Sequence, residues 1–303
     1  DDGPSIENKF KTVDESNLTP ETPLVRTETL DFDFGSDGAG SIKAEGTFIA
    51  KYEMDGYSEA ITSGGEAIDV SVDGNSYVGK LAGGEIVFTL DIHPTSGEYT
   101  YTQYLPLDHH IAGDPDEIIW LQFQVEICDA DGDTALAWIG MDVHDSAVND
   151  LEISGEVVVD ETDLDPTDDA GGVVTANFGG DGLGGFMATD ASSFEFTGNA
   201  GADLTSGGEP VVVTLEGGVY VGRADGVDIF TLDIEADGTY TFTLIGQLDH
   251  ADTSDPNDVI ELTFGVKATD ADGDSASGDI TVQVLDDGPS IENKFKTVDE
   301  SNL

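Results

Sequence analysis

The sequence predicts an all-β protein built from tandem antiparallel β-sandwich domains of the immunoglobulin-like kind. Three observations carry this prediction. Short runs of alternating apolar residues recur along the chain, turn-forming residues separate these runs, and the sequence repeats itself with a period long enough for a complete domain.

The apolar residues alternate with polar ones at the two-residue period of half-buried strands. Residues 88–92 and 230–234 share the sequence FTLDI, a longer alternating run covers 119–127, and another covers 240–244. Clusters of Gly, Asp, Asn and Ser separate the runs, and no segment combines a 3.6-residue period with helix caps. Short strands with turn-rich connections favour a sandwich, and a barrel is the less favoured alternative.

The chain carries two internal periods. Residues 1–18 recur identically at 286–303, an offset of 286 − 1 = 285, and TSGGE at 62–66 returns at 205–209 after about half that length. The shorter period predicts one domain at residues 1–144, a second at 145–285, and the start of a next repeat or a linker at 286–303. We therefore expect the segment to come from a longer protein that contains many 285-residue double units in tandem.

The charge of the chain limits its partners. Asp and Glu total 64 against 10 Lys and Arg, which gives a formal charge of −54, while 38% hydrophobic residues suffice for a core in each domain. Repulsion excludes nucleic acid and anionic membrane surfaces. No apolar run reaches membrane-spanning length, so no membrane insertion is expected. Cys128 is the single cysteine, so an intrachain disulfide is excluded.

Two acidic turns are the main candidate metal sites. Asp129, Asp131 and Asp133 alternate in the sequence DADGD, and the second repeat retains all three as Asp270, Asp272 and Asp274. Calcium takes about six to eight oxygen ligands, which such a loop supplies. The Gly stands at the fourth position, unlike the sixth in an EF-hand, and strands flank the turn. The alternative is an ordinary solvated hairpin turn.

Further acids are expected at the domain ends, where they could complete these sites or form neighbouring ones. A cation shared across a joint would remove a hinge there, and the alternative is that these residues are polar linkers. The additional candidate ligands are Asp14, Glu15, Asp160, Glu161, Asp114, Asp116, Asp255, Asp258, Asp145, Asp286 and Asp287. At the middle joint only Asp145 of the acidic pair remains, so that junction is expected to bind metal less tightly.

Several motifs together carry a family resemblance: DADGD at a strand turn, an apolar run that ends in DDGPSI, the LDH tripeptide at 107–109 and 248–250, and a period near 142 residues. Their combination resembles the tandem repeats of type I-secreted giant RTX adhesins of Gram-negative bacteria. The resemblance implies a calcium-stiffened extender at the cell surface, which projects distal binding domains in biofilm formation and folds after export. Its partners would be neighbouring repeats. GGDGLGGFM at 179–187 departs from the RTX nonapeptide, so no β-roll is expected.

Three other interpretations of the sequence compete with the spacer. Trp120 and Trp138 flank the first DADGD turn and could be cross-strand neighbours, forming a sugar-stacking platform in a lectin-like module. Catalysis is disfavoured because the chain has no GxSxG, HExxH or phosphate-cradling Gly loop, and the duplicated Asp-His pair is more simply a loop element. A halophile's surface would spread its carboxylates evenly, whereas here they gather in turns.

Overall fold

The computed structural model describes residues 3–52, 60–111, 113–114, 116–155, 157–164, 167–199, 201–252, 254–255 and 257–287. Within these ranges the secondary structure is β-strand with three short 3-10 helices, which confirms the all-β prediction. No helix in the described part of the chain has the length and apolar character needed to span a membrane. The predicted segment 286–303 lies outside the described residues except for Asp286 and Asp287, as do Asp1 and Asp2.

The chain forms two compact units. Unit 1 consists of Asp1–Leu151, Ala176–Gly185 and Ala268–Ala276, and unit 2 consists of Glu152–Thr175, Phe186–Lys267 and Ser277–Leu303. Two segments of the second sequence repeat, 176–185 and 268–276, therefore belong to unit 1. The repeat boundaries inferred from the sequence period stay predictions.

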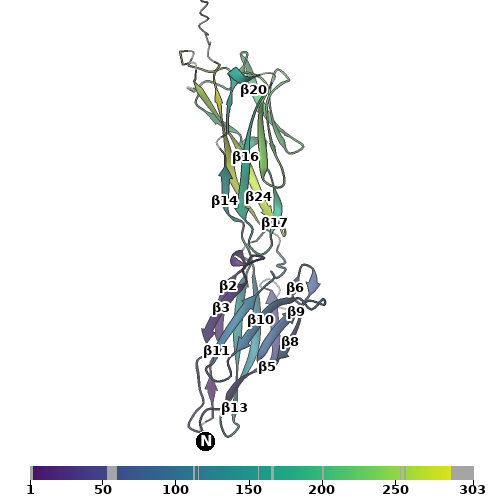
Figure 1. The fold of residues 1–303 in the computed structure, drawn as a ribbon, viewed down its shortest axis with the longest axis vertical. Helices are drawn as coiled ribbons and strands as arrows, with labels where there is room; N and C mark the ends of the chain where they lie inside the picture. Colours follow the sequence, from purple (N-terminus) through teal and green to yellow (C-terminus); the bar gives the residue numbers. More distant parts are fainter. Residues whose placement is uncertain are drawn as a thin grey trace, which may run out of the picture. The chain divides into compact units, whose positions relative to one another are not determined.

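Unit 1 contains a five-stranded and a four-stranded sheet (Figure 1). The first has the order β3 (Leu24–Thr29), β11 (Glu98–Gln103), β10 (Ile86–Ile92), β9 (Ser76–Lys80) and β8 (Asp69–Asp73). The second has the order β2 (Lys9–Asp14), β13 (Thr134–His144), β12 (Ile118–Cys128) and β5 (Ser41–Tyr52). Smaller pairs join β1 (Ser5–Ile6) to β4 (Phe32–Asp33) and β6 (Thr62–Ser63) to β7 (Glu66–Ala67).

The sheets of unit 2 repeat this plan. One has the order β14 (Asn149–Ser154), β16 (Asp168–Asn177), β23 (Thr239–Leu244), β22 (Val227–Ile234), β21 (Val219–Ala224), β20 (Glu209–Glu216) and β19 (Thr205–Ser206). The other has the order β15 (Val157–Asp160), β25 (Ser275–Leu285), β24 (Val259–Asp270) and β17 (Leu183–Ala188), and β18 (Glu195–Thr197) also pairs with β24. The 3-10 helices are η1 (Glu15–Asn17), η2 (Glu161–Asp163) and η3 (Ala191–Ser193).

Aromatic side chains from both sheets fill each core. In unit 1 the ring of Phe123 on β12 lies 5.9 Å from that of Phe88 on β10 in an edge-on arrangement. In unit 2 Phe264 on β24 and Phe230 on β22 repeat this contact, also at 5.9 Å. Complete burial of one such side chain stabilises the fold by about 1.5–3 kcal/mol. The alternating residues predicted from the sequence thus face a sandwich core.

Among the strand pairs whose register is described, each unit contains one that is parallel. β2 pairs with β13 in parallel, with Phe10 opposite Gly140, and β15 pairs with β25 in parallel, with Val157 opposite Val282. Alternation along a single strand shows which residues are buried but not the direction of the neighbouring strand. The antiparallel prediction is therefore wrong for these two pairs.

Candidate metal centre

Three separate segments of unit 1 bring carboxylates together. Asp145 follows β13 directly, Asp181 lies between β16 and β17, and Asp272 lies in the turn between β24 and β25. One carboxylate oxygen from each lies within 4.8 Å of the other two. We call this group the three-aspartate cluster. Because its members are distant in sequence, only the folded chain presents all of them together.

A second group shares Asp145 and adds Glu15 and His109, and we call it the Glu–His–Asp cluster. The Nε2 atom of His109 lies 3.6 Å from Oε2 of Glu15 and 3.9 Å from Oδ1 of Asp145, and all three side chains are completely buried. Glu15 begins η1, whose N-cap is Asp14. The backbone N–H of Leu107 donates to Oε1 of Glu15 at 2.9 Å, which fixes this carboxylate beside the histidine.

Glycines position the loop that carries Asp181. The N–H of Gly180 donates to the carbonyl oxygen of Glu15 at 3.0 Å, and the Ser146 hydroxyl donates to Asp181 Oδ2. Gly179 has a positive φ of 56°, and a β-carbon there would lie 2.9 Å from Cα of Ser16. Only glycine combines this backbone conformation with so close an approach. The glycine-rich sequence therefore fixes the path of the Asp181 loop.

Each residue of the LDH tripeptide at 107–109 has its own role. The Leu107 N–H donates to Glu15, and the His109 ring belongs to the Glu–His–Asp cluster. The Asp108 carboxylate accepts hydrogen bonds from the N–H groups of Gly64 at 2.7 Å and Gly65 at 2.8 Å. The motifs TSGGE and LDH, which recur together in the sequence, are therefore joined by hydrogen bonds from the two glycines to the aspartate. This explains why both were retained in the second repeat.

Unit 2 contains a copy of the Glu–His–Asp cluster, made by Glu161, His250 and Asp286. His250 Nε2 lies 3.6 Å from Oε1 of Glu161, and the histidine side chain is 2% exposed. The N–H of Leu248 donates to the same Glu161 oxygen at 2.6 Å. A pocket at this point is lined in part by Glu161, His250 and Asp286.

The first DADGD turn forms a further cluster, in which Asp129 and Asp131 meet Asp37. Oδ1 of Asp129 accepts hydrogen bonds from the N–H groups of Gly132 at 3.0 Å and Asp133 at 2.9 Å, so this oxygen organises the turn itself. The other oxygen, Oδ2, is buried and has no hydrogen-bond partner among the described residues. The hairpin-turn alternative thus accounts for one of the two oxygens.

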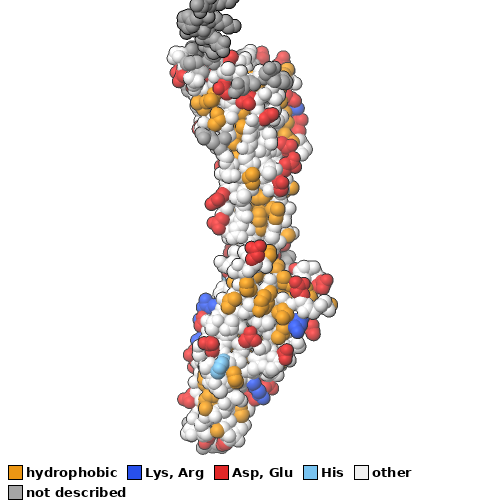
Figure 2. Space-filling model, viewed as in Figure 1, with side chains coloured by type: hydrophobic (Ala, Val, Ile, Leu, Met, Phe, Trp, Pro, Cys, Tyr) orange, Lys and Arg blue, Asp and Glu red, His pale blue; other side chains and the backbone are white. Residues whose placement is uncertain are grey.

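Burial and mutual repulsion disfavour the ionised form of the clustered carboxyl groups when no cation is bound. Burial, together with the charges of Asp272 and Asp181, raises the pKa of Asp145 to about 8. Burial, with the charges of Glu15 and Asp272, raises the pKa of Asp181 to about 6. Figure 2 shows acidic side chains scattered over the visible face of each unit and few basic ones. A bound cation would offset this repulsion.

Buried carboxylate oxygens without a hydrogen bond indicate whether a cation could bind at the clusters. Among the described residues, buried carboxylate oxygens without a hydrogen bond include Glu15 Oε2, Glu117 Oε1, Asp145 Oδ2, Asp272 Oδ1 and both side-chain oxygens of Asp274. Leaving a buried acceptor without a partner costs about 1–3 kcal/mol, and more for a charged group. Hard oxygen donors of this kind suit calcium. Imidazole nitrogen does not, so His109 and His250 do not fit a calcium ligand set.

The predicted ligands fall into three groups. Those in the four clusters are Glu15, Asp129, Asp131, Asp145, Glu161, Asp272 and Asp286. Others support local structure: Asp14 and Asp160 cap η1 and η2, Asp114 and Asp255 accept N–H bonds within their turns, and Asp258 accepts from Val259. The remaining candidates, Asp116, Asp133, Asp270, Asp274 and Asp287, lie outside the four clusters of the described chain.

Asp272, a member of the three-aspartate cluster, nevertheless contributes to raised pKa values at Asp270 and Asp274. Burial and then Asp272 raise the pKa of Asp270 to about 7, and burial, Asp272 and Asp114 raise the pKa of Asp274 to about 6.

The sequence prediction missed Asp37, Asp181, His109 and His250. A signal for the first two existed, because SDGAG at 36–40 and GDGLG at 180–184 are copies, each placed before the strand that pairs with the DADGD hairpin.

The predicted pairing of Trp120 and Trp138 is wrong. The register of β12 and β13 places Trp120 opposite Asp142 and Trp138 opposite Gln124. The two indoles are therefore offset by four residues along the hairpin, about 13 Å at the usual rise of a strand. Both are half-buried, but they do not form a cross-strand pair. The observation on which the lectin-like alternative depended is thereby removed.

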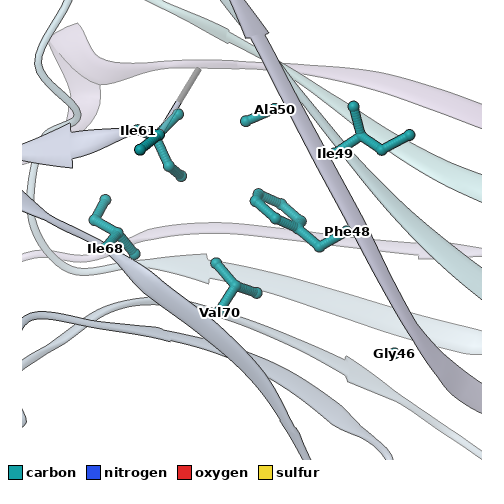
Figure 3. A pocket seen from close by; sticks show the side chains of 8 residues that line it. Gly46, Phe48, Ile49, Ala50, Ile61, Ile68 and Val70 are labelled. Carbon is teal, nitrogen blue, oxygen red and sulfur yellow. The ribbon is translucent and has the colours of Figure 1, made fainter. Parts of the chain in front are cut away.

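An apolar pocket of about 400 Å³ in unit 1 opens between β5 and β8. Figure 3 shows Ile61, Ile68, Val70 and Phe48 pointing into the same space. The described residues of its lining carry no titratable side chain, and they are Gly46, Phe48, Ile49, Ala50, Ala60, Ile61, Ile68 and Val70. The pocket is thus part of the seam between the two sheets, and the ionisable groups lie elsewhere.

Solved structures that are similar to this chain include cadherin and protocadherin fragments. Mouse clustered PcdhgC3 EC1-3 is 17% identical, with 94% of this chain and 69% of that chain covered and a TM-score of 0.25. Drosophila N-cadherin EC1-4 is 14% identical, with 94% and 50% covered and a TM-score of 0.24. The chain thus spans half the length of the latter. Scores this low support no argument about function.

Among curated proteins, none matches this chain. A family model, by contrast, matches it twice, at residues 11–142 and 156–283, and so covers most of its length. Each match includes one LDH tripeptide and one DADGD turn. The chain therefore belongs to the family described as "Domain of unknown function (DUF5801)".

Proposed function

We propose that this chain is a calcium-stiffened spacer of an extracellular adhesin and not an enzyme. The observation that supports the proposal most directly is the three-aspartate cluster of Asp145, Asp181 and Asp272. It combines three carboxylates, two of which have a buried oxygen without a hydrogen-bond partner in the described structure, Asp145 Oδ2 and Asp272 Oδ1. Bound calcium would supply the positive charge that lets these groups stay ionised at close range.

The residues around the cluster have distinct roles in this proposal. Asp145, Asp181 and Asp272 would bind the ion, and Ser146 would orient Asp181 through its hydroxyl. Gly179 and Gly180 hold the Asp181 loop against η1. Ordering these segments costs conformational entropy, which calcium binding offsets in the folded state only. Asp37, Asp129 and Asp131 would form a second calcium site at the other end of β13.

The type of adhesin and its place on the cell are part of the same proposal. The sequence resemblance to extender repeats of type I-secreted RTX adhesins supports a place at the bacterial cell surface and a role in biofilm formation. In such an array the chain's partners would be neighbouring repeats. The recurrence of residues 1–18 at 286–303 supports a tandem arrangement.

Calcium titration of the full chain by calorimetry tests the proposal. We expect binding by the intact chain, at least tenfold weaker binding at one site in Asp181→Asn, and unchanged binding in Asp69→Asn, which removes an exposed acid of β8 in the same unit. Small-angle scattering should give a narrower distribution of dimensions with calcium than with chelator. Equal binding by both variants, or scattering that calcium leaves unchanged, would contradict the proposal.

A further inference from the structure

Two histidines with buried side chains supply imidazole nitrogen, a ligand that does not suit calcium. The side chain of His109 is completely buried, and neither of its ring nitrogens has a hydrogen-bond partner in the described part of the chain. Its Nε2 lies 3.6 Å from Glu15 and 3.9 Å from Asp145, too far for a hydrogen bond to either carboxylate. A buried imidazole whose ring nitrogens make no hydrogen bond is costly, so its position beside two carboxylates points to a ligand.

The same arrangement is retained in the second repeat, in unit 2. The His250 side chain is 2% exposed, and neither of its ring nitrogens has a hydrogen-bond partner in the described residues. Its Nε2 lies 3.6 Å from Glu161, and Asp286 completes the group. The two repeats have diverged over most of their length, yet both retain a glutamate, a histidine and an aspartate in one place. A loop hydrogen bond does not explain this, because neither histidine makes one.

The distances match a smaller and softer ion than calcium. Ligand atoms bound at about 2.1 Å in a tetrahedral arrangement lie about 3.4 Å from each other. The separations of 3.6 and 3.9 Å around His109 are close to this value. Imidazole with two carboxylates is a donor set for zinc and neighbouring first-row metals. In unit 2 the second ring nitrogen, Nδ1, faces Oδ2 of Asp258 at 3.8 Å, on the side where carboxylates orient metal-bound histidines.

We propose that the clusters Glu15–His109–Asp145 and Glu161–His250–Asp286 each bind a divalent first-row transition metal, for which zinc is the representative probe. Three protein ligands leave at least one coordination position for water or another donor. Asp145 belongs to both the zinc and the calcium group in unit 1, whereas the unit 2 site shares no residue with the three-aspartate cluster. The zinc proposal therefore does not rest on the calcium proposal.

Zinc titration of the full chain in millimolar calcium tests this inference. Calcium occupies the carboxylate sites and suppresses weak surface binding. We expect two zinc ions for the intact chain, one for His109→Gln, one for His250→Ala and none for the double variant. His93→Ala, which removes an exposed histidine, should still bind two. Glutamine keeps most of the volume of the buried ring, and circular dichroism checks that each variant is folded.

X-ray absorption at the zinc edge supplies a second measurement, because an imidazole ligand gives a distinct scattering pattern. That pattern should be present in the intact chain and absent in the double variant. Two zinc ions still bound by the double variant would assign the binding to surface carboxylates. No zinc binding by the folded intact chain, or displacement of zinc by an equal concentration of calcium, would also overturn the proposal. Calcium-dependent melting that persists in the histidine variants separates this outcome from the spacer proposal.

Discussion

Gly184 lies directly against the carbonyl oxygen of Asp270, where a β-carbon would overlap that oxygen. Gly40 has the same relationship to Cys128 in the first repeat. These contacts hold the loops that carry Asp181 and Asp37 beside the two DADGD turns. Each acidic turn thus packs against a glycine at or just before the start of the strand that pairs with its hairpin, and the cluster depends on backbone packing as much as on charge.

We predict that Gly184→Ala destabilises the chain by about 1–3 kcal/mol, because the added methyl group must displace backbone. Calcium binding should weaken as well, since the Asp181 loop would shift. Gly83→Ala is the matched control, because no atom would lie within 4 Å of its new β-carbon. Denaturant unfolding of both variants, with and without calcium, measures the difference. Equal stability of the two would argue against the packing role.

Asp249→Asn should loosen the TSGGE turn of unit 2. The Asp249 carboxylate accepts N–H bonds from Gly207 at 3.0 Å and Gly208 at 2.7 Å. The hydrogen bond from the Thr205 hydroxyl, with those from the two glycines, lowers the pKa of Asp249. Hydrogen bonds to a charged group contribute about 1.5–3 kcal/mol, so we expect a loss of this order at most. Asp233→Asn, an exposed change on β22, serves as the control in the same unfolding experiment.

Asp181→Asn should have opposite effects in the two states of the site. Without calcium it removes one charge from a repulsive cluster, so the variant should be more stable than the parent. With calcium it removes a ligand, so the variant should be less stable, and tenfold weaker binding corresponds to about 1.4 kcal/mol. Denaturant unfolding in chelator and in calcium measures both signs. A variant that is destabilised equally in both media would show that Asp181 is only a structural residue.

The pH dependence should also differ between the two states. In the folded chain, burial and then neighbouring charges raise the pKa of Asp145 to about 8 and that of Asp181 to about 6. Between the unfolded value of about 3.9 and these values the folded state binds more protons than the unfolded chain. Stability without calcium should therefore decrease as the pH rises from about 4 to about 8.

Calcium competes with these protons, so the stabilisation that calcium adds should grow over the same pH range. Unfolding of metal-free protein, with and without added calcium, at several pH values checks this. A calcium effect that is larger at pH 5 than at pH 8 would mean that these carboxylates do not bind the ion.

Local patterns predicted the cores well. Phe123 and Phe264 stand in alternating runs, and alternation reports burial in a strand whatever its neighbours are. The register of Trp120 was not predictable in this way, because it depends on where the DADGD turn closes the hairpin. The direction of β2 was missed for a related reason, since strand alternation contains no information about the partner strand.

The candidate site was only partly predictable for the same reason. Asp272 stands in a duplicated turn and could be found from spacing alone. Asp181 approaches it through a loop whose path is fixed by Gly179 and Gly184, and that path is a tertiary property. His109 meets Glu15 only in the folded chain, because the two are far apart in sequence. The duplicated LDH tripeptide was a visible signal, but its partner was not.

Thermal unfolding with and without calcium tests the central claim most directly. A ligand that binds only the folded state stabilises it by about 2.7 kcal/mol for each site at a hundredfold excess over its Kd. We predict that millimolar calcium raises the Tm substantially over that in chelator, whereas the same concentration of magnesium, which accommodates such a ligand set poorly, gives a smaller increase. An identical Tm in calcium and in chelator would contradict the account.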